Sequence, residues 1–356
     1  MDRRTATLLI GLLICSVGAA SAARDANWEA LNKEAMALYE KGQYGRAEEV
    51  ARLALDAAVK AKGPDDPAVA TSLDTLAVIE YTQGRYAAAE PLYARARAIA
   101  ERTYGKDDPR VAPILDDLAR LYRTEGRYAE AEPLYRHVVT IMEKAYGPDD
   151  PLVATALSNL AAFYRDQRQY AKAEPLYTRA HTITEKHFGP NAPATAKSLN
   201  NFAEFYHDQG HYYEAVQMYK RALAIEEKVL GPDAPAVATS LNDLAALYYD
   251  QRRYAKAEPL YKRALAIREK ALGPDHPAVA TSLDNLAVLY IAQRRYNKAE
   301  PLFKRSLLIV EKALGPDHPA VATSLNNLAG LYLKTGREAE AKECANRAAA
   351  ILAIKR

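Results

Sequence analysis

The sequence predicts an all-α solenoid of about eight antiparallel helix pairs, and three recurring residues carry this prediction. A glycine returns every 42 residues without insertion or deletion, at Gly63, Gly105, Gly147, Gly189, Gly231, Gly273 and Gly315. A proline keeps the same step, at Pro67, Pro109, Pro151, Pro193, Pro235, Pro277 and Pro319. A leucine keeps it as well, at Leu73, Leu115, Leu157, Leu199, Leu241, Leu283 and Leu325. A fixed period of this length indicates a repeat protein, whose repeats bury their apolar faces only by stacking on one another.

The period divides the chain into eight repeats inside one predicted solenoid domain, residues 23–356. The predicted repeats are residues 24–63, 66–105, 108–147, 150–189, 192–231, 234–273, 276–315 and 318–356. The two end repeats differ from the others: the first carries Trp28 and Met36, and the last has Glu338 where the others have tyrosine. Such differences are typical of terminal repeats, which need a polar outer face because nothing stacks on them.

The repeat at residues 276–315 shows how each first helix is encoded. Apolar residues recur along one helical face, at Val279, Leu283, Leu286, Ala287 and Tyr290. Pro277 suits the first turn, where a missing N–H group costs nothing, and Asp275 or His276 can cap that turn. The helix should end near Gln293.

The second helix of that repeat is predicted from about Asn297 to Leu314. Its buried side is expected to hold Ala299, Leu302, Phe303, Ser306 and Val310. Pro301 lies near the first turn, so we expect a tight or slightly distorted start. Gly315 should end the helix in the left-handed conformation, and Pro316 prevents its continuation.

A tyrosine marks the turn between the two helices in six repeats, at Tyr86, Tyr128, Tyr170, Tyr212, Tyr254 and Tyr296. Recurring aromatic residues can form a stacking platform for bases or sugars. Strict recurrence at one position favours a packing role instead, and we expect a buried ring with the hydroxyl at the rim.

The amino terminus is predicted to be a signal peptide, residues 1–22. Arg3 and Arg4 precede an apolar run, 6–17, and cleavage is expected after Ala22. The protein is therefore expected to be periplasmic or secreted, with no stable membrane span after cleavage. The alternative is an uncleaved leader that anchors the chain in a membrane, because residues 5–23 are just long enough to span one.

The composition argues against a nucleic-acid partner, a cofactor and an active site. Lys and Arg number 48 and Asp and Glu 45, so the formal net charge of +3 leaves no dense basic stripe. The two cysteines, Cys15 and Cys344, exclude a disulfide framework and a cysteine-based zinc site. Neither a nucleotide-binding glycine loop nor a recognised hydrolase or metalloprotease motif occurs. We predict that the protein is not an enzyme and has no cofactor.

Two histidines, His276 and His318, recur 42 residues apart and invite comparison with a metal pair. Equivalent residues of stacked helices should lie roughly 8–10 Å apart, whereas a shared metal needs both nitrogens within about 2 Å of it. The two residues are better interpreted as helix-start residues, and no metal site is predicted.

The helix positions resemble those of the tetratricopeptide repeat family. Leu286, Ala287, Tyr290, Ala299 and Phe303 have the spacing of that pattern, and Ser306 completes it. The step of 42 residues and the strings LGPDHPAVATSLNNLA and YAKAEPLYKRALAI are similar to kinesin-light-chain-type repeats over roughly residues 27–356. Two repeats, 24–63 and 192–231, depart most from the pattern.

The resemblance implies a right-handed superhelix with the first helices along its concave side. Members of the family bind extended peptides or partner helices in that groove, so the resemblance implies a protein or peptide partner here. Transport of kinesin cargo is not implied, because a chain with a bacterial-type leader does not resemble a true kinesin subunit.

Eleven residues are candidates for the peptide-binding groove. They are Arg120, Arg123, Asn159, Arg165, Asn200, Asn201, His207, Asn242, Tyr249, Asn285 and Asn326. In related groove binders, asparagines at these positions hold the ligand backbone, and an amide offers both a donor and an acceptor. The alternative is that the asparagines bond to the neighbouring repeat. The arginines could grip an acidic peptide, or they could pair locally with Asp116 and Asp117.

The sequence therefore predicts a non-catalytic scaffold that binds a peptide or partner segment in its concave groove after export. One alternative is a structural solenoid of the envelope, with weak self-association through its terminal helices. The other is a cytoplasmic adaptor, if the leader is not a signal.

Overall fold

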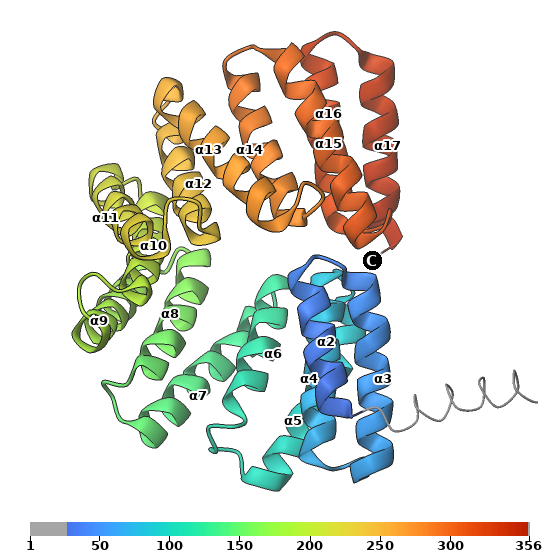
Figure 1. Ribbon diagram of the computed structural model, residues 1–356, viewed down its shortest axis with the longest axis vertical. Coiled ribbons are helices and arrows are strands. Elements are labelled where there is room, and N and C mark those ends of the chain that lie inside the picture. The colour runs from blue at the N-terminus through green and yellow to red at the C-terminus, as the bar shows by residue number, and fades with distance from the viewer. Residues whose placement is uncertain (1–26, 355–356) are drawn as a thin grey trace, which may run out of the picture. The chain divides into compact units, whose positions relative to one another are not determined.

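The computed structural model describes residues 27–354, in which sixteen α-helices form eight pairs (Figure 1). The first helices of the pairs are α2 (Trp28–Glu40), α4 (Pro67–Thr82), α6 (Ala112–Thr124), α8 (Pro151–Asp166), α10 (Pro193–Asp208), α12 (Pro235–Asp250), α14 (Pro277–Ala292) and α16 (Pro319–Lys334). The second helices are α3 (Tyr44–Lys62), α5 (Tyr86–Tyr104), α7 (Tyr128–Tyr146), α9 (Tyr170–Phe188), α11 (Tyr212–Leu230), α13 (Tyr254–Leu272), α15 (Tyr296–Leu314) and α17 (Glu338–Ile354). The all-α repeat class is confirmed. The predicted leader, residues 1–22, lies outside the described residues.

The helices divide into two compact parts, and the boundary between them falls between Asp117 and Leu118, inside α6. The N-terminal part holds helices α2 to α5, and the C-terminal part holds helices α7 to α17. Each part is described by itself below.

Four first helices, α4, α8, α14 and α16, begin as their sequence predicts, with proline in the first turn and a side-chain cap before it, whereas α10 and α12 have the proline without the cap. Asp150 accepts a hydrogen bond from the backbone N–H of Leu152 at 2.8 Å. His276 does the same through Nδ1 for Ala278, at 3.1 Å, and His318 caps α16 in the same way. Because such a bond satisfies an otherwise unpaired donor, the histidines are helix caps, as the sequence indicates.

The turns depend on backbone that only glycine adopts without strain. The second helices from α3 to α15 end at a glycine such as Gly189, whose φ is +89° and whose N–H donates to the carbonyl of Glu185 at 2.9 Å. At the turn inside three repeats, arginine replaces glycine: Arg168, Arg252 and Arg294 have φ between +57° and +59°. A side chain in this left-handed region costs conformational energy, so these turns are strained.

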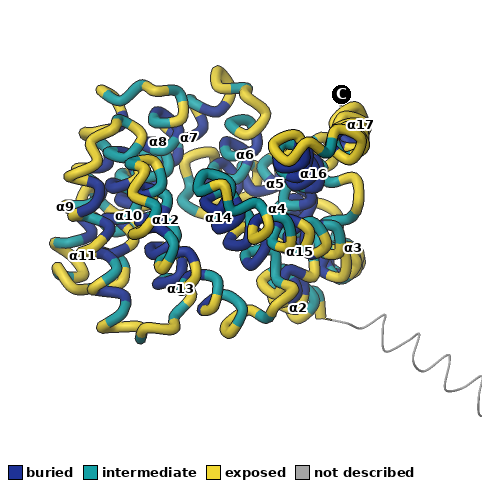
Figure 2. Tube along the Cα trace, turned by 90° about the horizontal axis from the view of Figure 1, so that it is seen from above, coloured by how far each residue is buried: buried dark blue, intermediate teal, exposed yellow. Residues whose placement is uncertain are grey.

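The predicted core positions are buried. In α14 all five predicted residues are at most 5% exposed, and in α15 Phe303 and Ser306 are at most 1% exposed. Leu302 is only half-buried. Figure 2 shows the buried residues along the sides of helices that face their neighbours, with the exposed ones at the loops.

The turn tyrosines are less buried than predicted. Tyr128 and Tyr212 are 40% and 38% exposed, and the other four are half-buried. The ring begins the second helix and packs against the next repeat, which covers it only in part. Tyr170 contacts the edge of Phe205, with ring centroids 5.9 Å apart. The expectation of a fully buried ring is therefore wrong, although the packing role holds.

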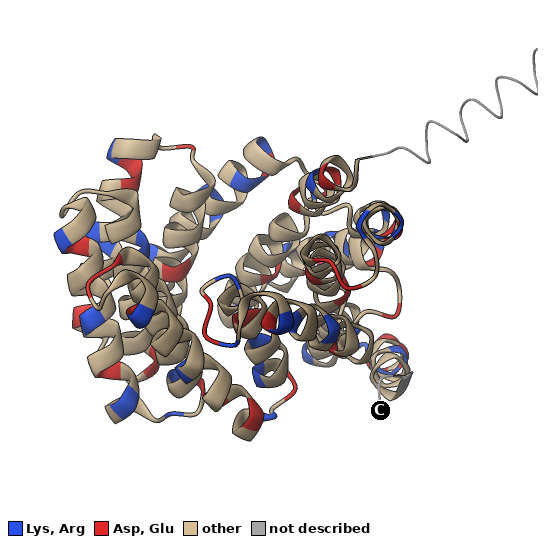
Figure 3. Ribbon diagram, turned by 90° about the horizontal axis from the view of Figure 1, so that it is seen from below, with Lys and Arg blue, Asp and Glu red and all other residues tan. Residues whose placement is uncertain are grey.

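The repeats of the C-terminal part are joined by ion pairs between consecutive second helices. Arg179 contacts Glu143 at 2.6 Å, and Arg263 contacts Glu227 at 2.5 Å, in each case 36 residues apart. Arg263 also donates to the carbonyl of Pro232 at 3.1 Å. Charges of both signs are interspersed over the helices (Figure 3). These contacts repeat because the residues do, and they fix the stacking of one repeat on the next.

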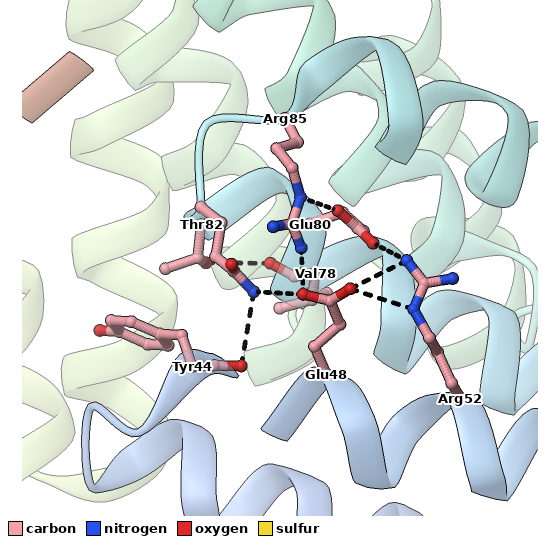
Figure 4. Close-up of polar contacts among 8 residues, drawn as sticks. Tyr44, Glu48, Arg52, Val78, Glu80, Thr82 and Arg85 are labelled. Atoms are coloured by element: carbon pink, nitrogen blue, oxygen red, sulfur yellow. Dashed lines mark hydrogen bonds and ion pairs between the residues drawn. The ribbon is translucent and has the colours of Figure 1, made fainter. Parts of the chain in front are cut away.

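The N-terminal part contains a buried carboxylate, Glu80, at the position where later first helices have tyrosine. Its oxygens accept from Arg52, at 2.7 Å, and from Arg85 (Figure 4). The neighbouring Glu48 also accepts from both arginines. Two guanidinium groups thus neutralise a carboxylate that is 1% exposed, as burial of a charge requires.

Candidate peptide-binding surface

The candidate surface lies on the first helices of the C-terminal part. There α10 contacts both α8 and α12, and α12 contacts α14, whereas neighbouring second helices make no contact of similar extent among the described residues (Figure 1). The first helices are therefore the more closely spaced set, and they form the inner, concave side of this part.

The charged candidates form a ladder of contacts between successive first helices. Arg123 of α6 contacts Asp166 of α8, with Nε and Oδ2 2.7 Å apart. Arg165 of α8, 10% exposed, pairs with Glu204 of α10 and lies 3.2 Å from Asp208 Oδ2.

The ladder continues from α10 to α12, where His207 Nε2 lies 2.7 Å from Asp250 Oδ2. The Arg123, Arg165 and His207 side chains therefore bind carboxylates of the next repeat. For these side chains the pairing alternative therefore holds, with partners in the next repeat. Arg120, also on α6, is half-buried.

Several candidate asparagines also form hydrogen bonds with the neighbouring repeat. Asn200 of α10 donates through Nδ2 to Ser240 Oγ of α12 at 2.6 Å, and more weakly to Glu226 at 3.3 Å. Asn285 of α14 donates to Asn242 Oδ1 of α12 at 2.7 Å. These amide donors serve the contact between repeats.

The remaining candidates lie apart from these bonds. Asn201 and Asn159 line clefts that are described next. Tyr249 is half-buried, with its ring centroid 5.7 Å from that of Tyr254. Asn326, on α16, is exposed.

Two clefts open on either side of α10. The cleft between α10 and α12, about 480 Å³, is lined among others by Asn200, Asn201, Glu204, Glu226 and Asp243. The cleft between α8 and α10, about 330 Å³, is lined among others by Leu152, Asn159, Phe188 and Asn201. Asn201 and Lys197 line both clefts. The structure thus gathers Asn159, Asn200 and Asn201 around one helix, and leaves Asn326 and Tyr249 outside these two clefts.

The candidate residues chosen from the sequence did not include Lys197, Glu226 and Asp243. A signal for each exists within the chain, because the repeats can be compared position by position. Lys197 stands where five of the other repeats have threonine, and Asp243 stands where four have asparagine. Glu226 corresponds to Thr184, Arg268 and Val310 in neighbouring repeats. Residues that depart from a repeat's pattern are free of its packing role, and such residues can serve a ligand.

Burial shifts the acid–base equilibria of this surface. It raises the pKa of Asp243 to about 6, where the Glu204 carboxylate adds to the effect and the Asn242 amide, Arg268 and His207 oppose it. Burial also raises the pKa of Glu226, although hydrogen bonds from Ser240 and Asn200 oppose that shift. Both carboxyl groups thus sit where their charge is poorly solvated.

The tetratricopeptide repeat model matches the chain at residues 29–100, 74–144, 114–186, 152–228, 195–270, 236–307 and 285–353. The chain belongs to the tetratricopeptide repeat family. A comparison with curated proteins gives no match.

Solved structures of other tetratricopeptide-type proteins are similar in fold. BtubC (BKLC) from P. vanneervenii is 24% identical, with a TM-score of 0.52, over 70% of this chain and 91% of its own. A Rap protein complexed with Competence and Sporulation Factor is 17% identical, with a TM-score of 0.58, over 92% of this chain and 99% of its own. The kinesin light chain repeats of Podosopora anserina are 27% identical, with a TM-score of 0.46, over 57% of this chain and 97% of their own.

The chemistry of the surface is that of hydrogen bonding and charge. Within residues 27–354, no group of three or more His, Cys, Asp or Glu side chains is placed to hold a metal ion. None of the helices searched in that range is long and apolar enough to cross a membrane. A tetratricopeptide groove with two clefts, amide groups and uneven charge is suited to hold the side chains and backbone of an extended segment.

Proposed function

We propose that the protein is a non-catalytic scaffold that binds an extended segment of a partner protein along α8, α10 and α12. The observation that carries the proposal is the pair of clefts that meet at α10 and share Asn201 and Lys197. One side chain of an extended segment fits each cleft, and the amide of Asn201 lies between them to bond the segment's backbone.

Two further observations support a groove at this place. The ladder of Arg123, Arg165 and His207 holds the first helices at fixed spacing, so the clefts exist before a ligand binds, which lowers the entropic cost of binding. In addition, the Rap protein that shares this fold was solved complexed with Competence and Sporulation Factor. That complex is an example of a partner held by a similar arrangement of helices.

The experiment compares three baits in a capture from envelope extract, all lacking residues 1–22. The first is otherwise unchanged, the second carries Asn159→Ala and Asn201→Ala, and the third carries Thr178→Ala and Lys220→Ala. The last two residues are exposed on second helices, so the third bait controls for surface change. A partner retained by the first and third baits and lost from the second supports the groove. Equal retention by all three baits would place binding elsewhere.

We also propose that the protein acts outside the cytoplasm, on the basis of the Arg3–Arg4 pair, the apolar run and the small residues before Ala23. Mass spectrometry of the protein purified from its source cells tests this. A chain that begins at Ala23 and fractionates with periplasm or medium supports export. A chain that begins at Met1 and remains with the cytoplasm supports the adaptor alternative, and one that begins at Met1 in membranes supports an anchor.

A further inference from the structure

The two clefts beside α10 differ in chemistry, and this difference indicates what the bound segment contains. The cleft between α10 and α12 is lined by Glu204, Glu226 and Asp243, against one cation, Lys197, which is exposed. Glu204 is paired with Arg165. Within residues 27–354, neither Glu226 nor Asp243 has an ion-pair partner.

Glu226 is the stronger observation, because its carboxylate is only 4% exposed and still lines the cleft. Its two oxygens accept from neutral donors, Ser240 at 2.6 Å and Asn200 at 3.3 Å. The buried Glu80 of the N-terminal part, by contrast, meets two arginines. A buried carboxylate without a cation is costly, and a cation from outside would remove that cost.

A second acceptor in the same wall is unused. The Oδ1 atom of Asn200 is buried and has no hydrogen-bond partner, although its Nδ2 is bonded to Ser240. A buried acceptor without a donor costs free energy, which a ligand N–H group can recover.

Arg268 acts on Asp243 electrostatically but does not form an ion pair with it. Arg268 of α13 donates to the carbonyl of Ala278 at 3.2 Å and to Ser282 Oγ at 2.9 Å, both on α14. Its guanidinium acts on Asp243 only from beyond ion-pair distance. The repeat fold does not require an acid at this position, because four other repeats have asparagine there.

The cleft between α8 and α10 is apolar where it opens. Leu152 and Phe188 are 48% and 49% exposed, and Pro151 and Ala194 line the same cleft. Half-exposed apolar side chains beside a cleft are suited to an apolar side chain of a partner.

The spacing of the two clefts fixes the register of a segment that fills both. Packed helices lie roughly 8–10 Å apart, and an extended chain advances about 3.3 Å per residue. About three residues therefore separate the side chains that enter neighbouring clefts.

We propose that the partner segment carries a lysine or arginine that enters the α10–α12 cleft, and an apolar residue about three positions away that enters the α8–α10 cleft. The cationic group bonds to the Glu226 and Asp243 carboxylates, and one of its N–H groups reaches Asn200 Oδ1. This inference rests on the proposed function, since it names the chemistry of the segment that the groove accepts.

A positional-scanning library of acetylated and amidated nonapeptides tests the inference, with the full chain as probe. We expect enrichment of arginine or lysine at one position and of leucine or phenylalanine about three positions away. Charge-assisted hydrogen bonds discriminate by roughly tenfold, so the best peptide should bind about tenfold more tightly than its glutamate counterpart.

Matched variants separate this cleft from general effects of charge. Asp243→Asn, which installs the residue of four other repeats, and Glu226→Gln should each reduce the preference for a basic residue several-fold. Lys197→Thr installs the residue of five other repeats and should tighten binding of the basic peptide. Asp284→Asn removes a carboxyl group that lies outside the cleft and should leave the preference for a basic residue unchanged.

The outcomes distinguish the two proposals. Peptides that bind in an Asn201-dependent way but are enriched in Asp or Glu would overturn the basic preference and leave the groove intact. A basic preference that survives both Asp243→Asn and Glu226→Gln would also overturn it. If no peptide in the library binds, and the capture experiment shows no loss with the groove variant, the proposed function itself fails.

Discussion

The substitution Asp243→Asn should make the protein more stable at neutral pH while it weakens binding. The pKa of Asp243 is raised from 3.8 to about 6, chiefly because the folded protein buries the carboxyl group. Since the folded pKa lies above the unfolded one, the unfolded state releases its proton first as the pH rises. The carboxyl group therefore destabilises the fold progressively between about pH 4 and pH 6, and fully above pH 6.

The size of the effect follows from the shift. A difference of about 2 pKa units corresponds to about 3 kcal/mol, at roughly 1.4 kcal/mol per unit. This value is an upper bound, because Asp243 keeps some contact with solvent. Asparagine has nearly the same shape and carries no charge. The variant should therefore gain up to about 3 kcal/mol at pH 8, and less than about 1 kcal/mol at pH 4.

Urea unfolding followed by circular dichroism at pH 4, 6 and 8 measures this gain. Asp284→Asn is the control, since burial raises the pKa of Asp284 to about 6 as well. Both variants should be stabilised at pH 8, and only Asp243→Asn should lose peptide affinity. If Asp243→Asn is no more stable than the unchanged protein at pH 8, or gains equally at pH 4 and pH 8, the argument from burial is wrong.

Three further substitutions test the packing account through urea midpoints. Ala192→Asp should stabilise the fold by about 1 kcal/mol, because α10 lacks the side-chain cap that Asp150 gives α8; no gain would contradict the capping argument. Arg252→Gly should raise the free energy of unfolding by up to about 1 kcal/mol, because glycine adopts the φ of 57° without strain. A lower free energy of unfolding would show that the arginine side chain contributes more than the strain costs. Arg165→Ala should cost about 2 kcal/mol, since it leaves Glu204 and Asp208 unpaired. Arg263 is 40% exposed, so Arg263→Ala should cost about 1 kcal/mol or less. Equal losses in the two variants would contradict the role of burial.

Most of the fold was readable from the sequence because it repeats. The spacing of Pro277, Leu283 and Gly315 fixes where a helix starts, what it buries and where it ends, and each signal is local. The burial of the turn tyrosines was not readable in this way. It depends on how far the next repeat covers the ring, and a periodic pattern carries no measure of that distance.

The candidate surface could be predicted only in part, because its contacts also depend on how one repeat lies against the next. The sequence places Asn200 and Asn285 on the first helices, but a bond to Ser240 or Asn242 depends on the offset between stacked helices. Glu226 belongs to a second helix, so a search restricted to first helices missed it. Its position becomes meaningful only when α11 and α12 are seen to share a cleft.

The central claim is that a partner lies along the inner surface at α10, and site-specific photo-crosslinking tests it most directly. A benzophenone amino acid is placed at Thr239, which lines the α10–α12 cleft, or at Lys220, exposed on α11. After irradiation in envelope extract, we predict a partner adduct from position 239 that a basic–apolar peptide competes away, and none from position 220. An adduct from position 220 alone, or equal adducts from both positions, would contradict the account.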